Sequence, residues 1–291
     1  MRILHIVLPE TGAYERKSQR VDQAALSASH EVLIASGLRD LPAADVAHLY
    51  ASRHLPARSL RGFPIPYLTN SAPAQSRIPW LRGRAPQWTI SPLAGDGLTV
   101  VPEAVEDQYF EEIRVATDEG TDRSVCATPA SRIENSSSAM DRPRVIGSFN
   151  RTALRGVVEQ TLGRLQRFRE DVSWHLFDRD PSPEDLDGLD AWVDPAVDPT
   201  DLDGFVAEAL VRGLPVVAGR TPINASRLEN GRTGWLVPAG DPNELTHAIL
   251  SALFKPELGQ TKISAAKQTR ARFRSRQRIR VLIPLYEALR P

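Results

Sequence analysis

Short apolar runs alternate with longer segments of helical period along most of the chain. In the first hundred or so residues, such runs are typical of buried strands. We expect these strands at residues 3–8, 31–35, 46–50, 66–69, 87–91 and 98–101. Residues 19–29 have the spacing of a helix, whereas the stretches between the later strands are rich in Pro and Arg. The pattern predicts an abbreviated α/β domain in which loops replace some of the helices.

A second series of strands and helices begins at residue 144. Strands are expected at 144–149, 172–177, 189–193, 215–218 and 235–237, and helices at 153–169, 205–212, just before Asn230, and at 243–254. Gly213 is placed to end one helix, and Asp241 followed by Pro242 is placed to begin another, with Asp241 as the N-cap. This alternation predicts a parallel sheet covered by helices.

Between these two regions the composition shifts to Asp, Ser, Thr, Pro and Arg, where no regular element is expected. We therefore expect a linker at 118–143, between an N-terminal domain of residues 1–117 and a C-terminal domain of residues 144–272. A chain of 291 residues with 41% hydrophobic residues has enough material for two cores, because a single core usually stops growing below this length.

The end of the chain is helical in composition and strongly basic. Eight basic and no acidic side chains lie between Lys262 and Arg280. One interpretation is contact with an anionic surface, such as a membrane or a nucleic acid. The other is a solvated helix face, which is favoured by an apolar stripe that would dock this segment onto the protein. The stripe contains Ile263, Phe273, Ile279, Leu282, Leu285, Tyr286 and Leu289.

Composition excludes several classes of function. Lys plus Arg and Asp plus Glu each total 36, so the overall charge favours no nucleic-acid partner. The single cysteine, Cys126, excludes an internal disulfide, and no His/Cys cluster is spaced for zinc. The irregular aspartates between residues 178 and 203 are expected in solvated loops rather than at a metal.

The N-terminus is typical of a first strand rather than a signal peptide, and no apolar run approaches the roughly 20 residues of a membrane span. We expect a cytoplasmic protein without metal or cofactor, with peripheral membrane contact only through the basic C-terminal helices.

Two segments carry a more specific pattern. Residues 204–218 read GFVAEALVRGLPVVA, and residues 230–242 read NGRTGWLVPAGDP. In order and spacing they resemble the donor-binding domain of the GT-B glycosyltransferases, in particular the retaining family 4, also called glycosyl transferases group 1. Weaker similarities at 1–7, 30–32, 44–48, 101–107, 145–147 and 273–289 extend the resemblance over most of the chain.

The resemblance implies an α/β protein with two Rossmann-like domains, whose parallel sheets face a cleft, and a C-terminal helix, 273–291, that crosses back to the first domain. It also implies transfer of a hexosyl group from a nucleotide-diphosphate sugar, with retention of configuration and without a metal. The acceptor is left open as a saccharide, a lipid or a small molecule.

The implied donor site begins at the helix over 205–212. A departing diphosphate is stabilised by cations and by the N–H groups at a helix N-terminus. Gly204, Phe205 and Val206 match the start of this helix, and Glu208 matches the family's glutamate that binds the ribose hydroxyls. As a structural alternative, Glu208 is a carboxylate that stabilises the helix N-terminus.

The implied phosphate-binding residues depart from the family pattern. The family's Gly-Arg is Gly147-Ser148 here, so that arginine is absent. Arg155 stands at the Lys-Gly position and Arg151 lies in the same loop; a guanidinium can bind a phosphate bidentately, although both are also typical of exposed helix starts. Arg220 and Thr221 lie where the family has a Gly-Gly loop.

The acceptor side is less well matched. Gly12 remains from a glycine-rich loop, and His48 aligns with a family histidine, although a lone histidine at a strand end is also typical of a structural role. Asn70 lies in the loop that often carries a catalytic histidine. His48 and Asn70 are the candidate catalytic residues.

Three functions therefore stay open. The first is the transferase. The second is a catalytically impaired GT-B protein that acts as a nucleotide-sugar-binding or partner subunit, because several phosphate-binding residues are replaced. The third is another GT-B activity, such as a sugar-nucleotide epimerase.

Overall fold

The computed structural model describes residues 1–9, 11–50, 65–70, 88–91, 99–111, 143–198, 202 and 204–290, and the structural statements below concern these residues. The chain divides into two compact units. Unit 1 comprises Met1–Glu106 and Arg272–Pro291, and unit 2 comprises Asp107–Ala271. The C-terminal segment therefore belongs to unit 1. The linker predicted at 118–143 lies outside the described residues except for Pro143.

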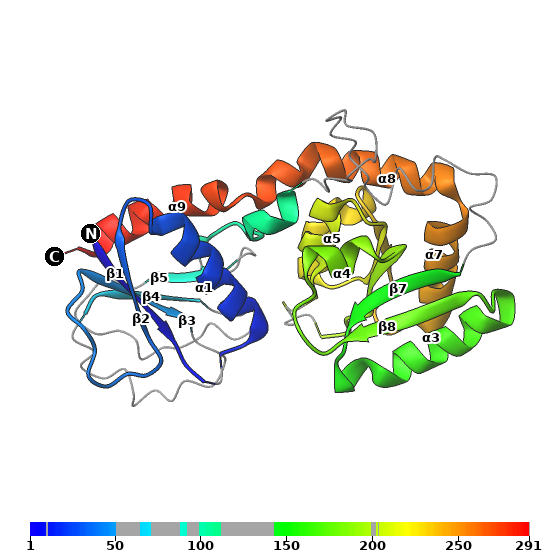
Figure 1. Ribbon diagram of the computed structural model, residues 1–291, viewed down its shortest axis with the longest axis horizontal. Helices are drawn as coiled ribbons and strands as arrows, with labels where there is room; N and C mark the ends of the chain where they lie inside the picture. Colours follow the sequence, from blue (N-terminus) through cyan, green and yellow to red (C-terminus); the bar gives the residue numbers. More distant parts are fainter. Residues whose placement is uncertain are drawn as a thin grey trace, which may run out of the picture. The chain divides into compact units, whose positions relative to one another are not determined.

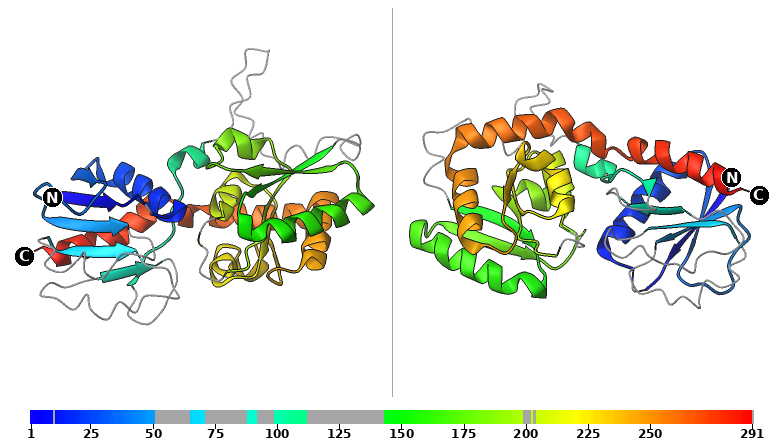
Figure 2. Two further views of the ribbon diagram at one scale, coloured as in Figure 1. Left: turned by 90° about the horizontal axis from the view of Figure 1, so that it is seen from below. Right: turned by 180° about the vertical axis from the view of Figure 1, so that it is seen from behind.

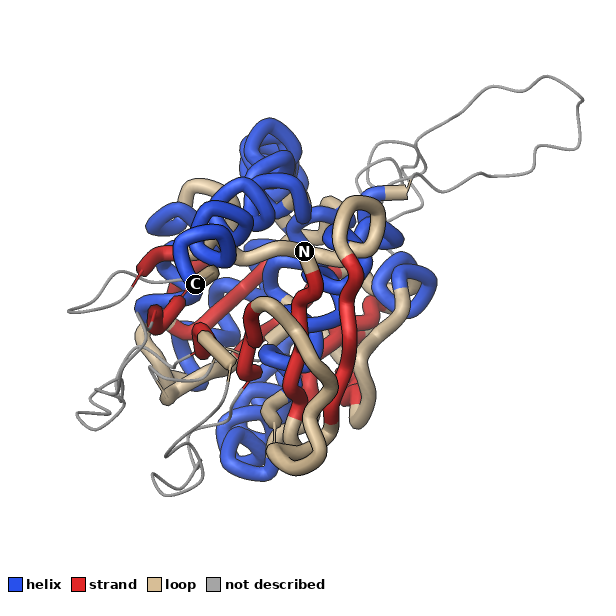
Figure 3. Tube along the Cα trace, turned by 90° about the vertical axis from the view of Figure 1, so that its left-hand side faces the viewer, coloured by secondary structure: helices blue, strands red, loops and turns tan. Residues whose placement is uncertain are grey.

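Unit 1 is built on a parallel sheet with the order β2-β1-β3-β4-β5-β6 (Figures 1 and 3). Its strands are β1 (Arg2–Val7), β2 (Glu31–Ala35), β3 (Val46–Tyr50), β4 (Tyr67–Asn70), β5 (Trp88–Ser91) and β6 (Thr99–Val100). Helices α1 (Ala13–Leu26) and α9 (Ser275–Leu289) contact each other, and Figure 1 shows them side by side. The chain thus returns from its far end to cover the sheet that its first residues form.

The two faces of this sheet have separate cores. Because side chains alternate along a strand, Ile3 and Val46 lie on one face, where they pack with Leu26 of α1 and Leu282 of α9. The neighbouring positions, such as Leu4, pack on the other face. Of the predicted apolar stripe, Leu282, Leu285, Tyr286 and Leu289 belong to the first of these cores and the half-buried Ile279 packs against it, so this part of the stripe docks onto the unit 1 sheet. Ile263 is also buried, but it belongs to unit 2.

Unit 2 contains a second parallel sheet, with the order β11-β10-β9-β7-β8. The strands are β7 (Arg144–Phe149), β8 (Val172–Phe177), β9 (Ala191–Asp194), β10 (Val216–Gly219) and β11 (Trp235–Val237). The helices are α3 (Arg155–Phe168), α4 (Pro183–Asp187), α5 (Val206–Arg212), α6 (Pro222–Arg227), α7 (Pro242–Phe254) and α8 (Pro256–Thr269). The unit also contains the short 3-10 helices η2 (Asp107–Phe110), η3 (Thr152–Leu154) and η4 (Glu229–Gly231). A further one, η5 (Arg270–Phe273), follows α8 where the chain passes from unit 2 into unit 1.

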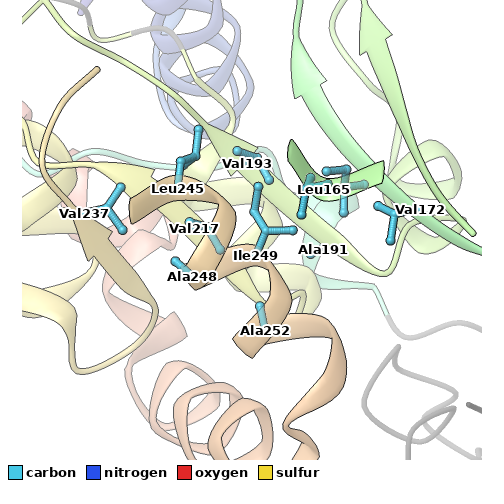
Figure 4. Packing of buried hydrophobic residues seen from close by; sticks show 11 residues of the cluster. Leu165, Val172, Ala191, Val193, Val217, Val237, Leu245, Ala248, Ile249 and Ala252 are labelled. Atoms are coloured by element: carbon cyan, nitrogen blue, oxygen red, sulfur yellow. The ribbon is translucent and has the colours of Figure 1, made fainter. Parts of the chain in front are cut away.

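The main core of unit 2 lies between the sheet and helices α3 and α7. In Figure 4, Ile249 and Leu245 of α7 point toward Val193 of β9 and Val217 of β10. Leu165 of α3 joins the same cluster, so α3 and α7 cover one face (Figure 2, green and orange helices). Helix α5 also packs on β9 and β10, but on the face of the alternate residues. The sheet is therefore buried on both sides, as its nearly continuous apolar strands require.

Most predicted elements occur within one or two residues of their expected bounds. Asp241 caps α7 by accepting hydrogen bonds from the backbone N–H groups of residues 243 and 244, and Gly213 ends α5 with a φ of 79°. The helix predicted at 19–29 was placed wrongly, because α1 covers Ala13–Leu26. Its buried face includes Lys17 and Asp22, so the apolar period is faint in its first half.

The aspartate-rich segment is also more ordered than predicted. Ser182 and Asp185 form a reciprocal capping box that begins helix α4. Asp194 ends β9 with a side chain that is only 4% exposed, so the expectation of solvated loops is wrong for this part of the segment. Among the helices that the structure describes, none combines the length and the apolarity needed to cross a membrane.

Candidate functional site

The topology of unit 2 indicates where a ligand would meet its sheet. Strands β8 and β9 lie on opposite sides of β7, so the chain direction across the sheet switches between β7 and β9. In open parallel sheets, ligands bind outside the carboxyl ends of the strands at such a switch point. Arg151 follows the end of β7, Asp194 is the last residue of β9, and Gly204 precedes α5.

These three residues meet at that edge, together with Asn224 of α6, and we call them the switch-point cluster. Arg151 Nη2 lies 3.6 Å from Asp194 Oδ1. Asn224 Nδ2 donates to Asp194 Oδ2 at 2.8 Å and to the Gly219 carbonyl oxygen at 3.2 Å. Burial raises the pKa of Asp194 above its ordinary value, against the opposing influence of the Arg151 charge and of the hydrogen bond from Asn224.

Gly204 is required by the close approach of its backbone to this ion pair. A Cβ atom at this position would lie 2.8 Å from Asp194 Oδ2 and 3.2 Å from Arg151 Nη2. The Gly204 carbonyl oxygen accepts a hydrogen bond from Trp192 Nε1 at 2.7 Å, which fixes the backbone from the side of β9. The sequence prediction placed Arg151 and Gly204 at one site, and the structure brings them together.

The start of α5 is buried beside the cluster. Phe205 has a φ of 50°, in the left-handed region, and stacks on Phe149 with 5.6 Å between the ring centroids. Val206 and Glu208 are both 0% exposed. In the ion pair between Arg151 and Asp194, Arg151 is the more accessible residue, with 14% of its side chain exposed against 4% for Asp194. An incoming ligand would therefore meet Arg151 before it meets Glu208.

The other predicted donor residues lie in different surroundings. Arg155 is 73% exposed and pairs with Glu159 one turn further along α3, at 3.2 Å. Arg220 is exposed at the end of β10. Thr221 is buried as the N-cap of α6, where its Oγ1 accepts from the backbone N–H of Asn224 at 3.3 Å. Thr221 thus orients the helix that carries Asn224, whereas Arg155 faces solvent.

The predicted catalytic residues of unit 1 form part of a buried polar layer. His48 is 0% exposed; its Nδ1 lies 2.7 Å from the hydroxyl of Tyr286 and its Nε2 lies 2.8 Å from Asn70 Oδ1. Burial lowers the pKa of His48 well below its ordinary value, and the nearby His5 lowers it further. His48 is therefore neutral, with both ring nitrogens hydrogen-bonded, an environment typical of a structural histidine.

Sequence reasoning did not find the rest of this polar layer. Asp22 of α1 accepts from Arg278 of α9 and from the hydroxyl of Tyr50, which lies 2.7 Å away. His5 is fully buried beside His48 and makes no side-chain hydrogen bond to the described part of the chain. These residues come from four elements, and no local sequence signal connects them.

The loop at Gly12 joins strand β1 to helix α1. Gly12 caps the start of α1 in an extended conformation. The neighbouring Thr11 is buried, and its hydroxyl donates to the Tyr50 carbonyl oxygen at 2.8 Å while it accepts from the Leu8 N–H at 2.9 Å. This loop therefore ties the ends of β1 and β3 together at the switch point of the unit 1 sheet.

The described residues contain no group of three or more His, Cys, Asp or Glu side chains arranged to hold a metal ion. The expected absence of metal and cofactor stays a prediction.

Solved structures define the class of fold. A glycosyltransferase from Rickettsia africae aligns with a TM-score of 0.67 and 14% identity, over 99% of this chain and 98% of that one. The Anabaena protein HepE, solved in complex with UDP, aligns with a TM-score of 0.64 and 14% identity, over 99% and 100%. Sucrose-phosphate synthase from Thermosynechococcus elongatus aligns with a TM-score of 0.65 and 14% identity, over 99% and 100%. The fold is the GT-B fold of glycosyltransferases.

Part of the sequence also matches a family model. Residues 144–254 match the family model described as glycosyl transferases group 1. The matched segment lies within unit 2 and contains the whole switch-point cluster, so the similarity to this family concerns unit 2. None of the curated proteins compared with the chain matches it significantly.

Proposed function

We propose that the protein is a glycosyltransferase that moves a hexosyl group from a nucleotide-diphosphate sugar to an acceptor, with retention and without a metal. Unit 2 would bind the donor at the switch-point cluster. The family match to this unit supports the proposal, as does the structural likeness to HepE, which has been solved with UDP and with UDP-glucose.

The observation that carries the proposal is the position of Arg151. Cleavage of the bond to the sugar leaves negative charge on the diphosphate, and a fixed cation nearby lowers the barrier. Arg151 is held at the carboxyl edge of the sheet, opposite the backbone of Gly204 and next to the start of α5. A guanidinium there can bind two phosphate oxygens at once. The role of Glu208 toward the ribose remains a prediction.

The acceptor is proposed to bind to unit 1, and its class is still a saccharide, a lipid or a small molecule. The catalytic role of His48 and Asn70 remains a prediction, and their burial and mutual contact favour positioning of the ends of β3 and β4. The cytoplasmic location and the membrane contact of the basic C-terminal helices also remain predictions.

The replaced phosphate-binding residue favours a second candidate function. Ser148 stands where the family has an arginine; it is 1% exposed and donates to the Phe149 carbonyl oxygen at 3.3 Å. A protein without that cation could bind a nucleotide sugar but fail to cleave it, and act as a binding or partner subunit.

Turnover distinguishes the two functions. The purified protein would be incubated with UDP-, GDP- and ADP-hexoses and cell extract as the source of acceptor, and products would be detected by mass spectrometry. The transferase proposal predicts release of one nucleoside diphosphate together with a product heavier by one hexose. Binding of a nucleotide without release over the whole panel would favour the binding subunit.

A further inference from the structure

We propose that Asp194 is a positioning residue that makes Arg151 the phosphate-binding cation of the donor site. The inference rests on the proposed function, and it assigns a role to a residue that neither the sequence pattern nor the family match singles out. Asp194 itself is not expected to touch the donor.

The first support is that Asp194 lies on a more rigid part of the backbone than Arg151 does. Arg151 lies in the short connection between β7 and the following 3-10 turn, and a free arginine side chain has roughly 2 kcal/mol of rotamer entropy to lose on binding. Asp194 ends β9, an interior strand of the sheet. An ion pair to a residue on that strand restricts Arg151 before any ligand arrives, which improves affinity by preorganisation.

The second support is that Asp194 is itself held in place. Its Oδ2 accepts from Asn224, whose backbone N–H is bonded to Thr221, so α6 fixes the orientation of the carboxylate. Its Oδ1 faces Arg151 at 3.6 Å, which is longer than a direct hydrogen bond. This pair therefore orients the guanidinium without the tight bidentate contact seen at Arg169 and Asp171, where Nη2 and Oδ2 are 2.7 Å apart.

The third support is a backbone built around the pair. Gly204 has no side chain at the point where a Cβ would contact both Asp194 and Arg151, and Trp192 fixes its carbonyl from the other side. A purely structural ion pair does not need the backbone of Gly204 to pass so close. The arrangement places the arginine against the segment at which the donor is proposed to bind.

The chain offers a matched control at the opposite edge of the same strands. Arg144 begins β7 and Asp190 precedes β9; their ion pair is 3.2 Å long, and the side chains are 9% and 8% exposed. This pair resembles the Arg151 pair in burial and in the strands it joins, but it lies at the amino edge of the sheet. Asp190→Asn therefore reports the structural effect of losing such a carboxylate.

The test is calorimetric titration with UDP, GDP and ADP and with the corresponding nucleosides. The informative quantity is the ratio of the nucleoside Kd to the diphosphate Kd for the base that binds best, because general destabilisation weakens both ligands alike. Asp194→Asn is expected to lower this ratio by about tenfold, because Arg151 would no longer be held in place and would lose about one charge-assisted hydrogen bond to the diphosphate. Asn224→Ala is expected to lower it by less, and Asp190→Asn is expected to leave it unchanged.

A double-mutant cycle isolates the route of the effect. If Asp194 acts through Arg151, the ratio falls no further in Arg151→Ala/Asp194→Asn than in Arg151→Ala alone. An unchanged or increased ratio in Asp194→Asn, or independent losses in the double variant, would overturn the positioning role while leaving the donor site intact. Should Asp194→Asn not fold, an unchanged ratio in Asn224→Ala would overturn it instead. A wild-type protein with no preference for diphosphates would overturn the proposed function itself.

Discussion

Arg278 of α9 and Asp22 of α1 form a buried bidentate ion pair across 256 positions of sequence. Nε lies 2.6 Å from Oδ1 and Nη2 lies 3.0 Å from Oδ2, and the side chains are 3% and 0% exposed. The guanidinium also donates to the Pro102 carbonyl oxygen at 3.3 Å. The end of the chain is thus joined to the first helix of unit 1 by charge as well as by apolar packing.

Removal of one partner from this pair should be strongly destabilising. Arg278→Met leaves the Asp22 carboxylate buried without its cation, and we expect a loss of about 3–5 kcal/mol in the free energy of unfolding of unit 1. Urea denaturation followed by circular dichroism measures this loss. Arg280→Met, at an exposed position of the same helix, is the control and should change stability by less than about 0.5 kcal/mol. Equal effects of the two substitutions would contradict the assigned importance of the pair.

The buried histidines of unit 1 should make stability depend on pH. Burial lowers the pKa of His5 to about 4 and that of His48 well below its ordinary value. When the pH falls below the unfolded value of about 6.5, the unfolded chain takes up protons that the folded chain does not. The stabilisation that neutral His5 contributes is complete above pH 6.5 and is lost as the pH falls toward 4, by roughly 1 kcal/mol per pH unit. The contribution of His48 has the same sign, because its pKa is also lowered.

Substitution of His5 tests this dependence. Because His5 makes no side-chain hydrogen bond to the described residues, His5→Leu removes no polar contact there. Urea unfolding between pH 7 and pH 5 should show a slope that is smaller by about one proton than in the wild type. An identical slope in the two proteins would mean that His5 titrates normally in the folded state.

Two glycines of unit 2 should respond to alanine in opposite ways. At Gly219 a Cβ would lie 2.3 Å from the main-chain oxygen of Ala196, so Gly219→Ala should destabilise by about 1–3 kcal/mol. At Gly163, within α3, a Cβ would meet nothing within 4 Å, and Gly163→Ala should stabilise by about 0.5–1 kcal/mol. Thermal unfolding of the two variants decides this, and destabilisation by both would show that α3 packs differently.

The sequence could predict what is local or repeated. The apolar runs predicted the strands, and turn chemistry predicted the cap at Asp241 and the helix end at Gly213. The motif at 204–218 predicted the arrangement of α5 and β10, because its residues lie next to one another in the chain.

The remaining features depend on the topology. Asp194 is one of many aspartates in its segment, and only the switch between β7 and β9 brings it to Arg151. Asp22 and Arg278 come from opposite ends of the chain, and Arg278 belongs to a basic segment that the sequence alone favours as a solvated helix face. A single sequence contains no signal for such a partnership.

Thermal unfolding in the presence of UDP, GDP or ADP tests the central proposal most directly. Saturation at about 100 times Kd adds roughly 2.7 kcal/mol to stability, so one of these nucleotides should raise the Tm of the wild type by several degrees. Arg151→Ala should lose most of this shift, whereas Arg155→Ala, at the exposed arginine paired with Glu159, should keep it. No shift in the wild type, or an equal shift in Arg151→Ala, would contradict donor binding at the switch-point cluster.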